Sequence, residues 1–292
     1  MEKKNTRRRF GDRRDGRRVR TLPPMVQMTP YIMKVRSDSQ NHFEDVIDIT
    51  NIESYLREKH QQGYKNMGIL HIFLAAYVRA IASRPGLNRF IAGQKIYSRN
   101  KIEGVMTIKK QMSIESPDTT IKVEFEPTDT AVEIYEKFTK VAEEALSADS
   151  DFDKTAGALI KIPGLLLRCA VGILRCMDYF DILPKALTKV SPFHGSFIIT
   201  SMGSLGINAI YHHLYDFGNL PVFLSFGKKY SDVVINDEGK AEKRHFVTFK
   251  AVTDERICDG YYYASAFKIV KRYLLNPKLL DVAPETVAED ID

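Results

Sequence analysis

The chain has 292 residues, of which 44% are hydrophobic and 27% charged, as is ordinary for a soluble globular protein. No apolar run follows the basic N-terminus as in a signal peptide, and no uninterrupted apolar stretch is long enough to span a bilayer. The three cysteines lack a metal-binding spacing, and their odd number suits free thiols in a reducing cytoplasm. We therefore expect a cytoplasmic protein with one large domain or two small ones.

The net charge of +6 comes from the N-terminus. Residues 1–20 contain ten Lys or Arg and three acidic residues, a net charge of +7, so the remainder is about −1. Such an arm is able to bind nucleic acid or anionic lipid, or to lie as a solvated tail over its own subunit or a neighbour. Because Phe10 is the only aromatic residue among the charges, we favour the tail and expect no nucleic-acid contact. We expect residues 1–24 to be a disordered basic arm and residues 281–292 a disordered acidic tail.

Helices and strands alternate in the first half of the chain. The pattern predicts a short helix within 26–38, a strand over 42–49 and a helix over 52–60. Residues 69–83 predict a strong helix, because apolar residues recur at spacings of three and four, and Pro85-Gly86 stops it. After a short strand within 87–97, alternation over 105–114 and 120–125 predicts a hairpin, and a helix follows over 130–146.

Residues 157–190 form an apolar helical segment with few charges. Lys161, Arg168 and Arg175 are seven residues apart and so lie on one narrow stripe of a helix over 163–179. A wide apolar face beside a basic stripe permits an interfacial helix on an anionic membrane. The alternative, which we favour on the sequence, is packing against the same subunit or its neighbour. Residues 181–190 predict a further short helix.

The last third of the chain is rich in strands. A buried strand over 196–200 runs into a Gly-rich turn, another strand covers 220–227, and 232–235 and 245–251 predict a hairpin. This hairpin leads into the charged turn 254–260, and a helix follows over 264–275. Strands joined by hairpins and interspersed with helices indicate one α/β domain with a mixed sheet and helices on its faces.

The charged turn resembles a known signature. Asp254-Glu255-Arg256-Ile257-Cys258-Asp259-Gly260 resembles the Asp-His-Arg-x-x-Asp-Gly signature of the dihydrolipoyl acyltransferases, the catalytic cores of 2-oxoacid dehydrogenase complexes, and the shorter His-x-x-x-Asp-Gly of the chloramphenicol acetyltransferases. Glu255 stands in the place of the histidine. Phe197 to Gly203 is similar to the Phe-Thr-Ile-Ser-Asn-x-Gly segment of the same family, and Pro85 to Tyr97 resembles a third segment. The resemblance covers residues 25–280. It implies an α/β fold with a chloramphenicol acetyltransferase-like mixed β-sheet and flanking helices, into which 157–190 is an insertion.

This resemblance implies acyl transfer from an acyl thioester, of the acyl-CoA or acyl-lipoyl type, in a homotrimer or higher oligomer whose active sites lie between subunits. It implies that Asp259 orders the turn through an ion pair and that Gly260 permits a tight turn. It places the oxyanion-stabilising hydroxyl at Thr200, with Ser201 one step away on the opposite face of the strand. It implies that Gly203, Ser204 and Gly260 contact coenzyme A, and we expect no metal.

The proton acceptor is the open question. Proton transfer from a thiol to a histidine is uphill by roughly 2.7 kcal/mol, and transfer to an ordinary glutamate is uphill by roughly 5.7 kcal/mol. Glu255 is therefore a weaker base than the histidine of the signature by about 3 kcal/mol. His212 and His213, just after the Gly-rich turn, are alternative bases, and His194 is a weaker candidate. A zinc site is disfavoured because no third ligand has a suitable spacing.

Two functions from different classes therefore remain. One is an acyltransferase that takes an acyl group from an acyl thioester to an unidentified acceptor. The other is a catalytically inactive homologue that binds an acyl carrier or scaffolds an assembly. The sequence favours the enzyme, because the hydroxyl strand and the Asp-Gly turn are both present.

Overall fold

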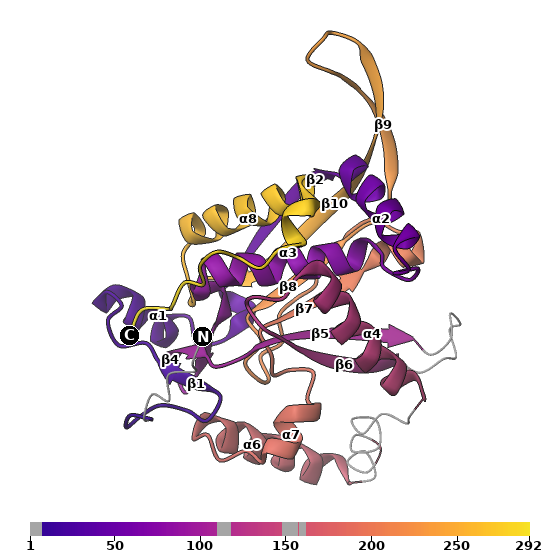
Figure 1. Ribbon diagram of the computed structural model, residues 1–292. Helices are drawn as coiled ribbons and strands as arrows, with labels where there is room; N and C mark the ends of the chain where they lie inside the picture. The colour runs from indigo at the N-terminus through magenta and orange to yellow at the C-terminus, as the bar shows by residue number, and fades with distance from the viewer. Residues whose placement is uncertain (1–7, 110–117, 148–156, 158–161) are drawn as a thin grey trace.

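A seven-stranded mixed β-sheet runs through the centre of the protein (Figure 1). The computed structural model describes residues 8–109, 118–147, 157 and 162–292. Six strands of the sheet lie in the order β2-β10-β8-β7-β5-β6, and β9 pairs with the first part of β10. Their bounds are β2 (Gln40–Asp48), β5 (Ile102–Lys109), β6 (Asp118–Phe125), β7 (Phe197–Ser201), β8 (Val222–Phe226), β9 (Tyr230–Ile235) and β10 (Ala241–Asp254). β7 is parallel to both of its neighbours, and the other pairs are antiparallel. The mixed sheet expected from the sequence is confirmed.

Some expected segments fall outside this description. Residues 1–7 of the basic arm, residues 110–114 of the expected hairpin and residues 158–161 of the apolar segment, with Lys161, lie outside the described residues.

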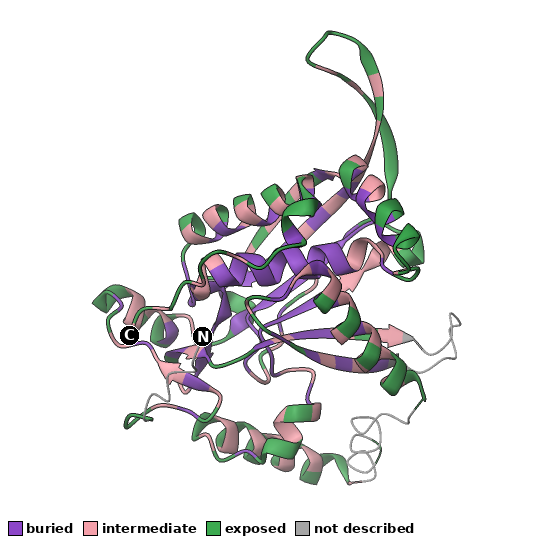
Figure 2. Ribbon diagram, in the orientation of Figure 1, coloured by how far each residue is buried: buried purple, intermediate pink, exposed green. Residues whose placement is uncertain are grey.

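One face of the sheet is covered by helices packed around α3 (Ile69–Ser83), whose bounds are those predicted from its apolar spacing. Every residue of α3 from Ile72 to Ala82 is buried, as expected for a helix with apolar residues on all sides (Figure 2). Phe73 stacks on Phe226 of β8 with ring centroids 4.8 Å apart, which fixes the helix against the sheet. Around α3 lie α2 (Thr50–Gln61), α4 (Ala131–Ser147), α8 (Gly260–Leu275) and the short 3₁₀ turns η2 (Pro85–Asn88) and η4 (Pro277–Leu280).

The opposite face of the sheet is covered by an irregular segment, residues 207–220. Leu214 and Leu220 of this segment pack on side chains from four strands, namely Val105, Ile198, Phe223 and Val252. The buried Arg36, in the 3₁₀ turn η1 (Arg36–Asp38), holds the segment in place by donating to the carbonyl oxygens of Tyr215, at 2.6 Å, and Gly218. Ser37 adds hydrogen bonds to the Asp216 carboxylate. The segment that bears the two adjacent histidines is therefore fixed to the sheet.

The two ends of the chain pair with each other. β1 (Gly16–Arg18) joins β4 (Lys95–Arg99) and β3 (Arg89–Ala92) in a small separate sheet. Arg17 pairs with Asp292 at 2.9 Å, and Arg89 pairs with Asp290 at 2.5 Å with both side chains buried. The sequence predicts disorder at both ends; in the structure residues 8–24 and 281–292 lie against each other, and their opposite charges meet. The division into arm, catalytic domain and tail stays a prediction.

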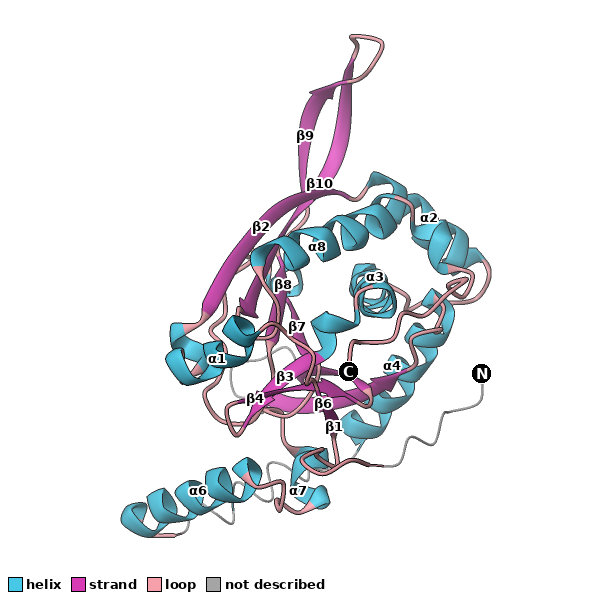
Figure 3. Ribbon diagram, turned by 90° about the vertical axis from the view of Figure 1, so that its left-hand side faces the viewer, coloured by secondary structure: helices cyan, strands magenta, loops and turns pink. Residues whose placement is uncertain are grey.

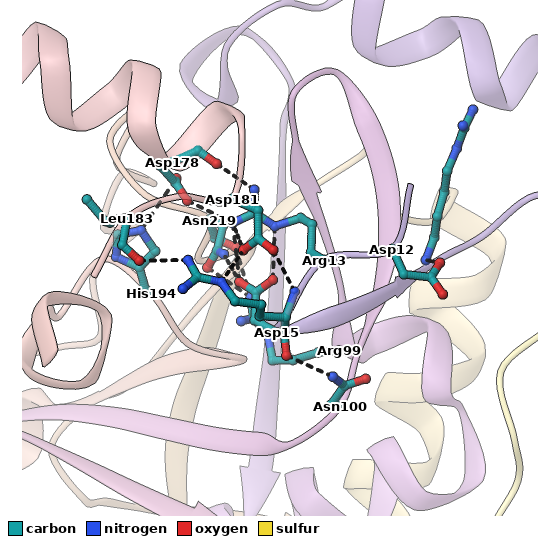
Figure 4. A network of polar contacts seen from close by, with 12 residues as sticks. Asp12, Arg13, Asp15, Arg99, Asn100, Asp178, Asp181, Leu183, His194 and Asn219 are labelled. Carbon is teal, nitrogen blue, oxygen red and sulfur yellow. Dashed lines mark hydrogen bonds and ion pairs between the residues drawn. The ribbon is translucent and has the colours of Figure 1, made fainter. Parts of the chain in front are cut away.

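The inserted segment forms α6 (Gly164–Tyr179) and α7 (Lys185–Val190), which lie together at the end of the molecule away from the β9–β10 hairpin (Figures 1 and 3). No residue of α6 is buried. Polar contacts with the N-terminal arm attach the segment to the body (Figure 4): Arg13 pairs with Asp178 at 2.8 Å, and Arg14 pairs with Asp181 at 3.3 Å. His194, which is buried, lies 3.4 Å from Asp178 through its Nε2 atom. This places His194 in the attachment of the segment.

Removal of the Asp178 charge should weaken this attachment. Burial by itself raises the pKa of Asp178, but the His194 imidazole and the Arg13 guanidinium more than offset this effect and lower the pKa to about 2. We expect Asp178→Asn to lower the free energy of unfolding by roughly 2 kcal/mol at neutral pH, measured by urea denaturation. Because the folded pKa is depressed, the difference from wild type should disappear as the pH falls from about 4 towards 2.

A matched control is Glu238→Gln, which removes a carboxylate from a highly exposed ion pair with Lys240. This variant should unfold like the wild type. Equal stability of Asp178→Asn and Glu238→Gln would contradict the role of Asp178 in attaching the segment.

Candidate functional site

The charged turn begins with a buried ion pair. Asp254 is the last residue of β10, and its carboxylate accepts two hydrogen bonds from the Arg256 guanidinium, at 2.8 and 2.7 Å. Both side chains are inaccessible to solvent, at 0% and 2% exposure. Arg256 also donates to the carbonyl oxygen of Met33 at 3.0 Å, and the Tyr263 hydroxyl donates to the carbonyl oxygen of Asp254 at 3.0 Å. The pair thus joins β10 to the segment before η1 and to α8, and it fixes the backbone on both sides of Glu255.

Glu255 itself is exposed between these two buried residues. Its backbone N–H donates to the carbonyl oxygen of Ser39 at 2.9 Å, so the position of the residue is determined by the backbone. Within the described part of the chain, its side chain forms no hydrogen bond or ion pair. The structure therefore presents the Glu255 carboxylate at the surface, on a turn that is well ordered beneath it.

Asp259 and Gly260 differ from what the resemblance implies. Asp259 forms no ion pair within the described residues; its Oδ1 atom accepts from the backbone N–H of Tyr262 at 2.8 Å and caps the N-terminus of α8. The ion pair that orders the turn is made by Asp254 and Arg256. Gly260 has no left-handed φ, and a Cβ atom there would meet open space. The turn in this chain does not require a glycine at that position.

The hydroxyl candidates lie at the end of β7. Thr200 is on the same face as Ile198, which belongs to the cluster under segment 207–220, whereas Ser201 is on the face of Ile199 and α3. Both are partly exposed. Gly203, in the 3₁₀ turn η3 (Met202–Leu205), must be a glycine because a Cβ atom would lie 2.6 Å from the carbonyl oxygen of Gly227. The exposed Ser204 donates to the carbonyl oxygen of Ser201 at 2.7 Å.

The sheet register separates the hydroxyl from the turn. Thr200 lies opposite Ser225 of β8, and Ser225 lies opposite Lys250 of β10. Glu255 follows five residues after Lys250, so it is about 17 Å further along the sheet at roughly 3.3 Å per residue. Thr200 and Glu255 of one chain therefore belong to opposite ends of the sheet. They do not form one site within a single copy.

Imidazoles gather between these two ends. His212 stacks on Phe223 with ring centroids 4.0 Å apart, and His213 stacks beside it at 4.7 Å. Burial lowers the pKa of His212, so its neutral form persists at lower pH than usual. His42, on β2, is directly opposite Val252, which is opposite Phe223, and packs edge-on against Tyr211. No sequence motif points to His42, because only the strand register shows that it shares this region.

One of these imidazoles, that of His212, lies nearer to Thr200 along the sheet than Glu255 does. Phe223, beneath His212, precedes Ser225 by two residues, a distance of about 7 Å along β8. His212 and Thr200 also share one face of the sheet. Among the described residues there is no group of three or more His, Cys, Asp or Glu side chains arranged to hold a metal.

The buried Asp254–Arg256 pair should be the most sensitive ion pair of the turn. Arg256→Met leaves the Asp254 carboxylate buried without its partner, so we expect a loss of about 3–5 kcal/mol in the free energy of unfolding. The control Lys271→Met removes an exposed ion pair with Asp45 at 2.8 Å, and it should lower the free energy of unfolding by less than about 1 kcal/mol. Urea denaturation of both variants measures the two losses. Losses of similar size would contradict the larger contribution of the buried pair.

The sheet order and the helices around α3 define a known class of fold, that of the chloramphenicol acetyltransferase-like acyltransferases. No protein-family model and no curated protein matches the sequence. Among solved structures, the chain is similar to the dihydrolipoamide acetyltransferase of Azotobacter vinelandii, with a TM-score of 0.58 and 14% identity over 90% of this chain and 93% of that one.

Two further structures have the same fold. The cubic core of the pyruvate dehydrogenase multienzyme complex matches with a TM-score of 0.53 and 14% identity over 90% of this chain and 93% of that one. A chloramphenicol acetyltransferase matches with a TM-score of 0.56 and 12% identity over 89% of this chain and 99% of that one. The fold indicated by the sequence resemblance is thereby confirmed. At these identities the likeness establishes the fold and leaves the activity to be argued from the site.

Proposed function

We propose that the protein is an acyltransferase that moves an acyl group from an acyl thioester, of the acyl-CoA or acyl-lipoyl type, to an unidentified acceptor. The observation that supports this most is the pair of accessible polar groups, Thr200 and Glu255, each at the end of a strand of the same sheet. The Asp254–Arg256 pair orders the turn around Glu255 at the expense of two desolvated charges. A turn fixed in this way holds the Glu255 carboxylate in one position, as a general base requires.

The proposed roles follow from the chemistry of acyl transfer. Glu255 removes the proton from the attacking group, and the Thr200 hydroxyl donates to the oxyanion of the tetrahedral intermediate. Ser201 is the alternative donor, while Gly203, Ser204 and Gly260 remain proposed contacts of coenzyme A. Asp259 acts through α8, whose first turn it caps. In the Azotobacter vinelandii enzyme a serine, a histidine and an asparagine have been investigated for roles in the catalytic mechanism.

Assembly is part of the proposal, because Thr200 and Glu255 can meet only between copies. We propose a homotrimer or higher oligomer, as the cubic core among the similar structures suggests for this fold. The turn is joined through Arg256 to Met33, which follows α1 (Pro24–Ile32), and exposed apolar side chains lie on and after this helix: Met25, Met28, Ile32 and Val35. Others, Leu205, Ile207 and Ile210, follow β7 beyond Thr200. Contact between two such patches would cover Glu255, and desolvation makes a carboxylate a stronger base.

One observation favours a second candidate function. Glu255 is exposed in the single chain and is intrinsically a weaker base than the histidine of the signature. A homologue that binds an acyl carrier without turning it over, or that scaffolds an assembly, would retain the fold with such a site. Coenzyme A binding without thioester turnover, together with a gain of turnover in Glu255→His, would favour this function.

The base can be identified by variants at three positions. If Glu255 is the base, Glu255→Gln should lower the rate of acyl transfer from acyl-CoA by about two to four orders of magnitude, while His212→Ala and His213→Ala change little. If His212 is the base, this pattern reverses, and the rate should rise with pH through a value below about 6.5, because burial lowers the pKa of His212. Normal coenzyme A binding and unchanged turnover in all three variants would contradict both assignments.

Mixed oligomers test whether the site is shared. Thr200→Val and Glu255→Gln should each be inactive alone, but chains co-refolded in equal amounts should regain about one quarter of wild-type activity, because that fraction of interfaces combines one intact Thr200 with one intact Glu255. If His212 is instead the base, Thr200→Val mixed with His212→Ala should regain nothing, because these two residues share one face of one copy and their site would lie within the chain. A stable monomer in sedimentation at micromolar concentration would exclude the shared site.

A further inference from the structure

The exposed side of α6 is apolar and has no covering element within the described residues. Leu165, Leu166 and Ile173 are 75%, 58% and 59% exposed, and Cys169 and Cys176 lie among them. Phe180 and Ile182 continue the exposed apolar surface beyond the helix. A helix of sixteen residues is about 24 Å long, so this surface extends well past a single side chain. In Figure 3 the helix extends outward along the lower edge of the molecule.

Charge distinguishes the exposed side of α6 from the attached side. Arg168 and Arg175 are exposed, seven residues apart along one edge of the apolar surface, and form no ion pair within the described residues. The one acidic residue of α6, Asp178, is on the attached side, where it binds Arg13 and its side chain is 13% exposed. The exposed side of α6 therefore combines large apolar side chains with positive charge alone.

This combination selects among the possible occupants. If two copies met through this side of α6, four arginines would come together with no carboxylate from either helix, and like charges repel. An anionic lipid surface supplies both of the complementary features, namely an acyl region for the leucines and phosphates or carboxylates for the arginines. No helix in the described part of the chain is long and apolar enough to cross a membrane, so the contact would be an interfacial one. We propose that α6 docks on an anionic membrane surface, with Leu165, Leu166 and Ile173 inserted among the lipids and Arg168 and Arg175 at the headgroups.

Such docking would determine how the subunit is oriented on the membrane. α6 is attached to the body through Asp178, Asp181 and the N-terminal arm, so lipid contact would orient the whole subunit with the β9–β10 hairpin directed away from the membrane (Figure 1). The inference does not depend on the acyl-transfer proposal, because none of these residues belongs to the candidate site.

Flotation with vesicles tests the docking directly. We expect the full-length protein to float with phosphatidylcholine vesicles that contain about one-third phosphatidylserine and to remain behind with pure phosphatidylcholine. Leu166→Glu combined with Ile173→Glu should abolish flotation. Arg168→Gln with Arg175→Gln should weaken it about 25-fold, at roughly fivefold for each arginine near the surface. The matched control is Val233→Glu with Ile235→Glu, two equally exposed apolar residues of β9, which should float like the wild type.

The native cysteines provide a second measurement that needs no substitution. Cys169 and Cys176 are exposed on the apolar side of α6, whereas Cys258 is buried, so a thiol-reactive environment-sensitive fluorophore labels the helix selectively. Its emission should shift to shorter wavelength with anionic vesicles. Failure of the wild type to float, equal flotation with neutral vesicles, or an unshifted emission would each overturn the proposal. A different pair of results would indicate that a second copy covers α6 instead. In that case the wild type does not float, and the Leu166→Glu, Ile173→Glu variant sediments with a lower mass than the wild type.

Discussion

The buried pair of Asp254 and Arg256 determines how the C-terminal half of the molecule is assembled. The two side chains satisfy each other, and the two residues make further hydrogen bonds with three other parts of the chain: the Ser39 hydroxyl, the carbonyl oxygen of Met33 and the Tyr263 hydroxyl of α8. A buried pair adds little net stability compared with apolar residues of similar volume, but breaking one leaves an uncompensated charge. Its contribution is therefore specificity, since only one arrangement of these elements leaves neither charge alone.

Much of the fold could be predicted from the sequence because the relevant signals are local. The bounds of α3 follow from apolar spacing and from Pro85, and β7, β8 and the β9–β10 hairpin follow from alternation and turn residues. β3 and β4 were less clear, since the turn between them, at Gly93 and Gln94, is short and has two positive φ angles. β1 could not be predicted: Gly16-Arg17-Arg18 has no apolar pattern, and charges at the other end of the chain hold it in place.

The candidate site was predictable in its parts but not in its geometry. A signature identifies residues, whereas their distances depend on how six strands are ordered and aligned. Only the register shows that Thr200 and Glu255 are at opposite ends of the sheet, and that His42 joins His212 between them. The roles of the motif residues also changed with context. Asp259 caps a helix, and the ion pair implied for it is made instead by Asp254, five residues earlier.

The pairing of β2 with β10 affects how the protein is made. Asp254 lies opposite Gln40, so the two strands are separated by about 200 residues of chain, and loop closure over that length is slow. During synthesis β2 emerges early, yet its partner leaves the ribosome only after about 200 further residues have been added. Until then the strand has a free edge, and the apolar α3 that follows it has no sheet to cover. The nascent chain is thus most prone to aggregate in the interval between these two events, and the emergence of β10 (Ala241–Asp254) ends it.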